Sequence, residues 1–337
     1  PGDGGVSMDV WMFVEGKGVQ RIVVPWLATI HVHATATRLE HLTNWLECGE
    51  ITQRFAVGSI RSIRSRLSLD QYEMHDVLEI EMRNNRSIRS LAEHIESRGD
   101  YYRYALYSID AHLAQRFFVE HNVAPFKYVQ WDGIRFTSHR KDMPWPKLKQ
   151  MEMEFHYESS TGFDTLNSTL TKIVLKTRTV DETKEQNQCI TLKHKTSEYE
   201  FLRSLQHEIN RINPDVILTK GGDSLHFSML QRLSDAASFS LNLSRKPSRL
   251  EARTNSRTVR SYGQVRRKES YVPTHGRLHI DLRSSFIVRE GGLLGLFELA
   301  RHSRQSPQDI SRLSPGSVIS AIQICLLYTS DAADDTP

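Results

Sequence analysis

The sequence is poor in cysteine and has no long apolar run, and each of these absences removes a class of protein. The three cysteines, Cys48, Cys189 and Cys325, are far apart and show no metal-binding spacing. This pattern excludes a disulfide-stapled scaffold and a zinc site built on paired cysteines, and reduced thiols of a cytosolic protein are the expectation. No apolar run is long enough to span a bilayer, so the sequence predicts no membrane partner.

A large excess of charge is lacking too. The chain has 44 Lys and Arg against 40 Asp and Glu, a formal net charge of +4 over 337 residues. A polycation is thereby excluded, and any nucleic-acid signal must come from local clustering of charge. With 39% hydrophobic and 25% charged residues, the composition is that of a soluble globular protein, and a prior of about 150 residues per domain predicts two domains, each with its own core.

Both ends of the chain suggest a piece of a longer protein. The sequence begins at Pro1 and not at a methionine. Residues 325–337, CLLYTSDAADDTP, do not continue the pattern before them and look like the translation of a sequencing adapter. We expect genuine sequence to end near Ile324 and residues 325–337 to be a non-native read-through tail. The alternative is a natural acidic tail.

The first half of the chain has the pattern of a mixed α+β domain. Two strands, VWMFV and QRIVVPW, flank the glycine-bearing turn EGKG and predict a hairpin. A strand at 28–34, a helix at 38–47, a strand at 76–83 and a helix at 87–98 with Ser87 as its N-cap follow. His31 and His33 share one face of their strand, as a metal pair or as ordinary strand histidines.

A strand, a helix and a second strand are predicted between residues 104 and 131. Asp110 is the expected N-cap of that helix, which should bury Leu113, Phe117 and Phe118. The segment DMPWPKLKQ then places two prolines around a tryptophan, which is typical of an ordered linker. We therefore place a domain boundary near residue 145.

The second half predicts three antiparallel strands followed by a helix, a parallel strand and a helix. The strands are QMEMEFHY, KIVLKT and QCITLKH, and the helix is EYEFLRSLQHEINRI. The continuous apolar run PDVILT is typical of a buried parallel strand, and DSLHFSMLQRL resumes the helical period after two glycines. This order is that of a ribonuclease H-like fold. A strand, RLHIDL, and a helix, GLLGLFELARHS, come last.

Basic residues cluster between these elements. Residues 244–277 hold ten Lys and Arg against two Glu, with two tyrosines, Tyr262 and Tyr271. A polar excursion of this length inside a domain is uncommon and often functional. A solvated surface is the alternative.

These segments resemble the N-terminal and 3′→5′ exonuclease regions of family B DNA polymerases of archaeal type. YALYSIDAHLAQRFFVEHNVAP is similar to a segment near the end of the family's N-terminal domain, and PWPKLKQMEMEF lies where the family has its first exonuclease motif, Asp-x-Glu. NPDVILTKGGDSLHF is similar to the second motif, Asn-Gly-Asp-x-x-Asp after a strand, and GRLHIDL to the strand after the exonuclease hairpin. The resemblance extends to Ile324.

The resemblance implies an N-terminal domain at 1–145 and an exonuclease-like, ribonuclease H-like domain at 146–324, with a mixed sheet flanked by helices and a basic hairpin insertion at 244–277. The fold class is therefore α/β (α+β). The third exonuclease motif and the polymerase domain are not in the sequence. DNA, single-stranded and as primer–template, is the implied partner, with replication accessory proteins, in a cytoplasmic, nucleoid-associated setting.

The catalytic positions depart from the family pattern. The exonucleases use two Mg²⁺ ions held by carboxylates. Glu152 and Glu154 stand at the first motif, as metal ligands or as outward-facing strand charges with Met151 and Met153 inward. Gly221 and His226 stand where the second motif has asparagine and the catalytic aspartate, and a neutral imidazole cannot replace a carboxylate in neutralising Mg²⁺. The site therefore resembles the branch of the family with inactivated proofreading.

A hairpin at the position of the basic stretch lies beside the template in the family. The basic residues implied to contact DNA phosphates are Arg245, Lys246, Arg249, Arg253, Arg257, Arg260, Arg266, Arg267 and Lys268. Two other interpretations stay open: an active metal-dependent exonuclease that uses Glu152, Glu154 and a later aspartate, and a stand-alone nucleic-acid-binding accessory protein.

Overall fold

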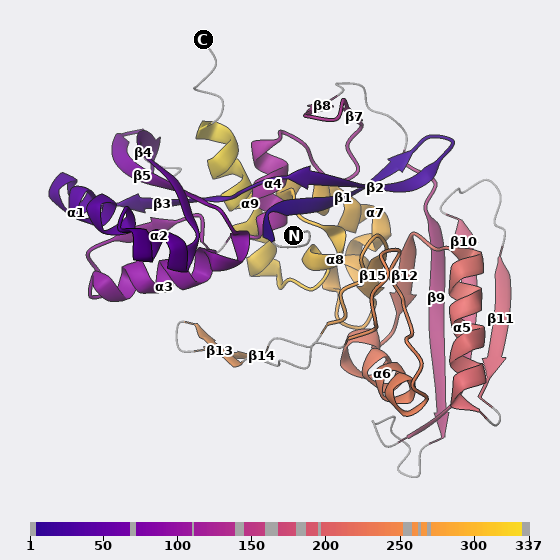
Figure 1. The fold of residues 1–337 in the computed structure, drawn as a ribbon. Helices are drawn as coiled ribbons and strands as arrows, with labels where there is room; N and C mark the ends of the chain where they lie inside the picture. Colours follow the sequence, from indigo (N-terminus) through magenta and orange to yellow (C-terminus); the bar gives the residue numbers. More distant parts are fainter. Residues whose placement is uncertain are drawn as a thin grey trace. The chain divides into compact units, whose positions relative to one another are not determined.

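The computed structural model describes residues 5–67, 72–109, 111–138, 145–158, 168–179, 187–194, 197–251, 258–261, 264–267 and 271–331. They fall into two compact units (Figure 1). Unit 1 comprises Pro1–Met143, Phe297–Ser306 and Leu313–Pro337, and unit 2 comprises Pro144–Leu296 and Pro307–Arg312. Both contain sheets and helices, which confirms the predicted mixed α+β class. Unit 1 also takes in segments that the predicted limits assigned to the second domain.

Unit 1 begins with the predicted hairpin. Strands β1 (Ser7–Val14) and β2 (Gly18–Pro25) pair antiparallel, with Val14 opposite Gly18. Gly16 and Gly18 have φ of 70° and 69°, left-handed values that a residue with a side chain adopts only with strain. The EGKG turn was therefore interpreted correctly.

A four-stranded antiparallel sheet in the order β4-β5-β3-β6 is the centre of unit 1. Its strands are β3 (Thr29–His33), β4 (Val57–Arg66), β5 (Met74–Met82) and β6 (Ala105–Tyr107). Helices α1 (Ala36–Leu46), α2 (Gly49–Phe55) and α3 (Ile88–Arg98) contribute Leu42, Phe55 and Leu91 to the same core. Strand β4 was not predicted, because this edge strand reads VGSIRSIRSR, buries only its first residue, Val57, and lacks a regular apolar alternation.

The start of α3 differs from the prediction. Ser87 precedes the helix in a helical conformation, and its side chain makes no capping hydrogen bond. Asn84 caps a short 3₁₀ turn, Asn85–Ser87, by accepting a hydrogen bond from the Arg86 backbone N–H at 2.9 Å. The expected serine cap is therefore wrong, because the chain enters the helix one turn earlier than its apolar period indicates.

The rest of unit 1 includes α4 (Leu113–Glu120), β7 (Val129–Trp131) and β8 (Phe136–Ser138). Phe117 is fully buried, while Leu113 and Phe118 pack at the edge of the core; the proposed cap Asp110 lies outside the described residues. The side-chain amide of Gln115 donates to the carbonyls of Ser303 and Ala321, each at 2.7 Å. Ala321 belongs to α9 (Pro315–Asp331), which enters the segment interpreted as a read-through tail and buries Cys325.

Unit 2 is built on a five-stranded mixed sheet in the order β11-β10-β9-β12-β15. The strands are β9 (Lys149–Glu158), β10 (Thr169–Thr179), β11 (Gln188–Lys193), β12 (Val216–Thr219) and β15 (Leu278–Asp281). Strands β9, β10 and β11 form an antiparallel meander, while β12 runs parallel to both β9 and β15. The predicted antiparallel meander and the parallel character of PDVILT are confirmed.

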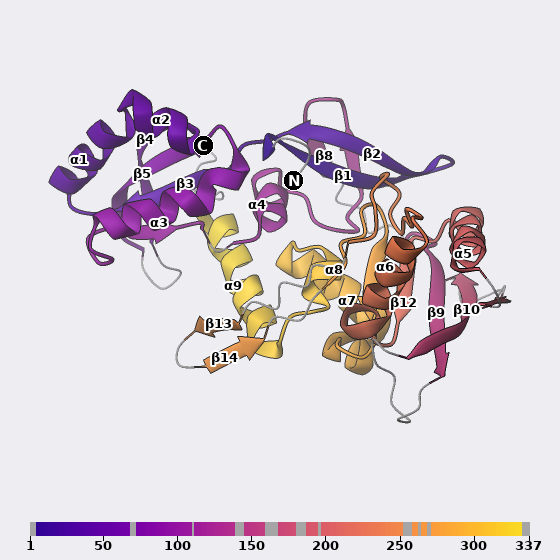
Figure 2. The same cartoon turned by 60° about the horizontal axis from the view of Figure 1, so that its bottom comes forward.

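Helices α5 (Glu198–Ile212) and α6 (Phe227–Ala236) cover one face of this sheet (Figure 2). Ser197 caps α5 by accepting a hydrogen bond from the Glu200 N–H, which fixes where the helix begins. Apolar side chains of both helices pack on Met151 and Met153 of β9 to form the core of unit 2.

A hairpin of two strands and two helices follow in the described part of unit 2. Strands β13 (Thr258–Ser261) and β14 (Gln264–Arg267) pair as a hairpin inside the basic stretch. Helix α7 (Phe286–Ser303) kinks at Gly292, where φ is 65°. Its residues from Phe297 onward belong to unit 1. The short helix α8 (Pro307–Ile310) lies against β15.

Candidate functional site

Glu152 and Glu154, the residues assigned to the first motif, lie on the face of β9 opposite Met151 and Met153. Met151 and Met153 are fully buried in the core of unit 2, and side chains alternate along a strand. Glu154 is ion-paired with Lys176 of β10, and the Lys220 Nζ lies 3.8 Å from the Glu152 Oε1. The side chains of Glu152 and Glu154 are 28% and 32% exposed. Each carboxylate therefore already has a cationic neighbour at the surface.

The turn after β12 keeps a defined geometry. Gly221 has φ of 103°, a value suited to glycine, and a single π-helical turn, Gly222–His226, leads into α6. A Cβ on Gly222 would lie 2.2 Å from the Thr219 Oγ1, so a larger residue cannot replace it without a shift. The Asp281 carboxylate accepts hydrogen bonds from the backbone N–H groups of Gly221 (2.8 Å) and Asp223 (3.0 Å). These bonds attach the turn to the end of β15.

His226 packs between aromatic side chains and has both ring nitrogens engaged. Its ring stacks on Phe155 with centroids 4.3 Å apart and planes 11° apart. The Lys220 carbonyl, 3.0 Å from Nε2, can only accept, so Nε2 carries the proton. In the neutral ring Nδ1 then accepts from the Tyr157 hydroxyl at 2.8 Å. No lone pair of the imidazole is left for a metal ion.

The residues assigned to the two motifs do not converge. His226 contacts Phe155 and Tyr157, which alternate with the glutamates along β9, so the imidazole and the two carboxylates lie on opposite faces of the strand. Among the residues that the structure describes, no group of three or more His, Cys, Asp or Glu side chains is placed to hold a metal ion. The donor set present therefore does not fit the two-metal arrangement that the resemblance implied.

A buried polar cluster lies where β12 and β15 end, and its members are Thr219, Asp223, His279, Asp281 and Arg312. The Arg312 guanidinium forms a bidentate pair with the Asp223 carboxylate, in which Nε donates to Oδ2 at 2.7 Å and Nη2 donates to Oδ1 at 3.1 Å. Its Nη2 also donates to the Nδ1 of His279 at 2.9 Å, and the His279 Nε2 then donates to the Thr219 Oγ1 at 2.8 Å. The cluster is a closed hydrogen-bond network with an internal counter-ion.

The protonation equilibria of this cluster follow from burial and from Arg312. Burial raises the pKa of the Asp223 carboxyl, the hydrogen bonds and charge of Arg312 act against that rise, and the neighbouring Asp281 charge adds to it. For His279, burial comes first and the positive charge of Arg312 second, and both lower the pKa well below the usual value of about 6.5. His279 is therefore a neutral hydrogen-bond bridge inside the fold.

Sequence reasoning missed most of this cluster. Asp281 and His279 were taken only as part of the strand RLHIDL, and Arg312 lies 89 residues after its partner Asp223. One signal was available: a histidine and an aspartate interrupt a strand whose neighbours are apolar. A polar side chain on a buried strand needs a partner, but the identity of that partner could not be read from spacing.

The structure places few side chains of the basic stretch. Arg245 is nearly buried and donates to the Asp215 carboxylate at 2.7 Å, and Arg249 is ion-paired with Asp235. Lys246 is half-buried. Arg260, Arg266 and Arg267 belong to β13 and β14. Arg253, Arg257, Lys268 and Tyr262 lie outside the described residues, and Tyr271 packs under the Arg312 guanidinium, 5.4 Å from its ring centroid.

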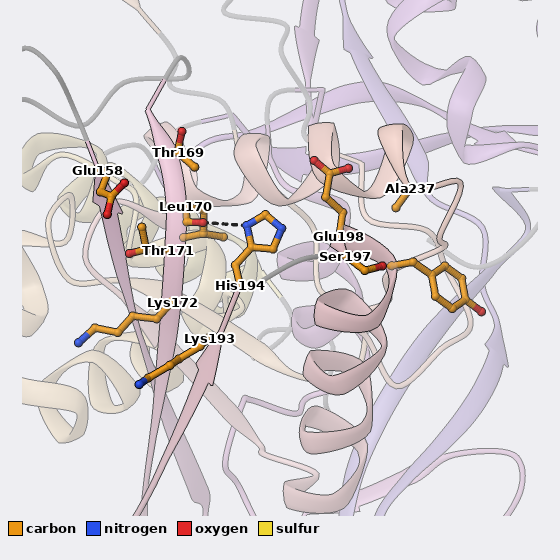
Figure 3. Close-up of a pocket in the computed structure, with 11 residues that line it drawn as sticks. Glu158, Thr169, Leu170, Thr171, Lys172, Lys193, His194, Ser197, Glu198 and Ala237 are labelled. Carbon is orange, nitrogen blue, oxygen red and sulfur yellow. Dashed lines mark hydrogen bonds between the residues drawn. The ribbon is translucent and has the colours of Figure 1, made fainter.

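An open hollow of about 880 Å³ lies at another part of unit 2, between the β10–β11 pair and the start of α5 (Figure 3). Lys172 and Lys193 stand directly opposite each other on β10 and β11, and their side chains extend in the same direction. His194 turns its Nδ1 to the Leu170 carbonyl at 2.9 Å. None of the residues predicted to act lines this hollow.

In unit 1 the histidine pair of β3 serves structural contacts. His31 lies 3.0 Å from the Ser108 hydroxyl through Nδ1 and 3.3 Å from the Glu79 carboxylate through Nε2. The hydrogen bond from His31 comes first in lowering the pKa of Glu79, against the effect of burial. His33 contacts the Asp76 carbonyl at 3.1 Å. The interpretation of the pair as ordinary strand histidines agrees with these contacts.

Comparison with known proteins adds one finding on the fold. No protein-family model and no curated protein matches the sequence. The structure is similar to that of the family B DNA polymerase from the hyperthermophilic archaeon Pyrobaculum calidifontis, with a TM-score of 0.70 and 13% sequence identity. The match covers 96% of this chain and 50% of the polymerase chain. At that identity the likeness shows the fold, and this chain spans about half the length of the protein it matches.

None of the described helices is both long and apolar enough to cross a membrane.

Proposed function

We propose that this chain is the N-terminal and exonuclease-like part of a family B DNA-directed DNA polymerase, and that its ribonuclease H-like unit binds DNA without cutting it. The fold supports the polymerase relationship, because the likeness to the archaeal enzyme extends over 96% of the chain. The sheet order, with an antiparallel meander followed by parallel strands, supports the ribonuclease H-like assignment of unit 2.

One observation carries the inactive reading: Glu152 and Glu154 lie on the face of β9 opposite His226. Two-metal hydrolysis requires several carboxylate oxygens within a few ångströms of both ions. Here the two glutamates have lysine neighbours, while the position of the expected aspartate holds an imidazole with both nitrogens occupied. Displacing reacting groups by only about 1 Å can lower a rate about a hundredfold, and opposite faces of a strand are farther apart than that.

The test is degradation of 5′-labelled single-stranded DNA in the presence of Mg²⁺ or Mn²⁺. The expected result is no 3′→5′ shortening above that of a Glu152→Ala, Glu154→Ala variant. Metal-dependent shortening that the wild type performs and the double variant does not would overturn the inactive reading and favour the active exonuclease.

DNA binding is the second half of the proposal, and the β13–β14 hairpin supports it. Arg245 and Arg249 already pair with aspartates, so we assign the phosphate contacts mainly to the rest of the basic stretch, including Arg260, Arg266 and Arg267. Each phosphate contact to single-stranded DNA contributes about 0.7 to the slope of log K against log salt. Changing those three arginines to glutamate should reduce that slope by about 2 or more.

The control for this experiment is Arg203→Glu, a charge reversal at a 68% exposed site on α5 of the same unit. It changes the net charge without touching the hairpin. An unchanged salt slope in the triple variant would contradict the proposed hairpin contacts, as would an equal loss per charge in the control.

A further inference from the structure

Strand β11 of unit 2 has an open edge. It comes first in the sheet order β11-β10-β9-β12-β15, so among the described strands only β10 pairs with it (Figure 1). The backbone N–H of His194 donates to the Thr171 carbonyl at 2.8 Å, which marks these two residues as a hydrogen-bonded pair of the ladder. Such pairs alternate with pairs that exchange no hydrogen bond, so the N–H and C=O groups of Cys189, Thr191 and Lys193 point away from β10. They form a template for a further strand.

A row of basic side chains reaches this edge. His156, Lys172 and Lys193 stand side by side on β9, β10 and β11, and the two lysines are directly opposite each other (Figure 3). Like charges in this position destabilise a pair of strands. Lys176 on the same face is ion-paired with Glu154. In the part of the chain that the structure describes, neither Lys172 nor Lys193 has an ion-pair partner. The row therefore ends at the open edge with positive charge that no described carboxylate neutralises.

The other face of β11 is apolar and only partly covered. Ile190 and Leu192 alternate along the strand with the residues whose backbone groups point outward, and both pack at the margin of the core of unit 2. Both are half-buried. A strand added beside β11 would bring its own apolar side chains against them, and burying that surface is favourable. The edge therefore favours an added strand that is apolar on one face and acidic at one position of the other.

We propose that the edge of β11 binds an extended acidic peptide segment of another protein, which pairs antiparallel with β11 as a further strand. Backbone hydrogen bonds to Cys189, Thr191 and Lys193 provide affinity, and alternate side chains of the peptide provide specificity. An Asp or Glu opposite Lys193 extends the basic row and neutralises it. Lysine at a sheet edge discourages pairing with a purely apolar strand, so Lys193 also selects against other partners.

Two observations favour a peptide over a nucleic acid. The edge offers backbone donors and acceptors at the spacing of a strand, and a sugar–phosphate chain does not pair with such an edge. Glu152 and Glu154 lie on the same face of the sheet as the lysines and would repel a polyanion laid along it. The site depends neither on the polymerase relationship nor on the β13–β14 hairpin.

The test uses a fluorescein-labelled peptide, Ser-Glu-Ile-Val-Ile-Thr-Ser, whose binding to the full chain is measured by fluorescence anisotropy. In the antiparallel register its Glu lies opposite Lys193 and its Val opposite Thr191, while its two Ile lie on the apolar face. Methylating the backbone nitrogen of the Val removes a hydrogen bond to β11 and should weaken binding about tenfold. Methylating the nitrogen of the first Ile, which points away from β11, should leave binding unchanged.

Two variants of the protein examine the same edge. Lys193→Glu should weaken binding about fivefold or more, and a peptide with Lys in place of its Glu should restore it. Thr191→Pro removes an N–H that points away from the sheet, which an edge strand tolerates, and should abolish binding while the circular dichroism spectrum is kept. Arg203→Glu, at a 68% exposed site on α5, is the matched charge control and should bind the peptide like the wild type.

Three outcomes would overturn the proposal. The first is equal binding of the two methylated peptides, or unchanged binding in Lys193→Glu. The second is displacement of the peptide by unlabelled oligo-dT together with loss of oligo-dT binding in Lys193→Glu, which would assign the lysines to nucleic acid. The third is a mass in sedimentation that rises with concentration in the wild type and stays constant in Thr191→Pro, which would assign the edge to a second copy of this chain.

Discussion

Unit 2 contains two pairs of acidic residues that have different surroundings in the fold. Asp223 and Asp281 are buried at the ends of β12 and β15, where a guanidinium and backbone N–H groups satisfy their oxygens. Glu152 and Glu154 lie on the face of β9 opposite Met151 and Met153. They are partly exposed, and each has a lysine beside it. The comparison teaches that an acidic residue near a motif can be assigned as a metal ligand or as a surface charge only when its burial and its counter-ion are known.

The largest effect should come from removing the counter-ion of the buried pair. Replacing Arg312 with alanine leaves Asp223 buried beside Asp281 without its cation, and losing one partner of a buried ion pair costs about 3–5 kcal/mol. Urea unfolding followed by circular dichroism measures this loss. Arg312→Lys should lose less, and Arg289→Ala, at an exposed pair on α7, should change little. A loss under about 1 kcal/mol for Arg312→Ala would contradict the importance of the buried pair.

The second-largest effect should be the contribution of neutral His279 to the pH dependence of the unfolding free energy. Its pKa is lowered in the folded state, so the unfolded chain binds the extra proton first as the pH falls. The stability that neutral His279 contributes is therefore full above about pH 6.5 and declines below it, by up to about 1.4 kcal/mol per pH unit.

A His279→Gln variant provides the comparison, because it removes this titration and keeps a polar side chain. Unfolding free energies at pH 7 and pH 5 should differ more in the wild type than in the variant, by at most about 2 kcal/mol. Asp223, whose raised pKa acts in the opposite direction, is present in both proteins. Equal pH slopes would show that His279 is not held neutral.

A third change addresses the opposite faces of β9 directly. His226→Asp places a carboxylate at the position assigned to the second motif, but it removes the stack on Phe155 and puts a charge beside aromatic rings. A loss of about 1–3 kcal/mol in unfolding free energy is expected, without any gain of Mn²⁺-dependent DNA cleavage. His226→Asn is the uncharged control. Cleavage in the Asp variant alone would mean that the two faces can cooperate.

The smallest effect should come from the exposed glutamates. Changing Glu152 and Glu154 together to glutamine removes both lysine contacts while keeping the size of the side chains. Ion pairs at the surface contribute little to stability, so the urea midpoint should stay within the spread of repeat measurements. A clear shift would show that this face of β9 is electrostatically coupled to the rest of unit 2.

Much of the fold could be predicted because periodicity reports burial. The helix α5 shows a period of about 3.6, while the glycine-bearing turn marked the β1–β2 hairpin and short apolar runs between polar turns marked the meander of β9 to β11. Strand β4 escaped prediction because an edge strand has few buried positions to mark its period. The start of α3 was misplaced because Asn84 and Ser87 are both cap-forming residues, and only backbone geometry separates them.

The candidate site, too, could be predicted from the sequence only in part. The sequence by itself determined that position 226 holds a histidine and not a carboxylate, that two glycines separate the strand PDVILT from the next helix, and that the positive charge gathers between residues 244 and 277. Only the tertiary structure decided that Arg312 neutralises Asp223 and that the glutamates and His226 lie on opposite faces of a strand. The physical reason is that a buried charge is paired by whatever the fold brings beside it, and an arginine 89 residues away leaves no periodic trace.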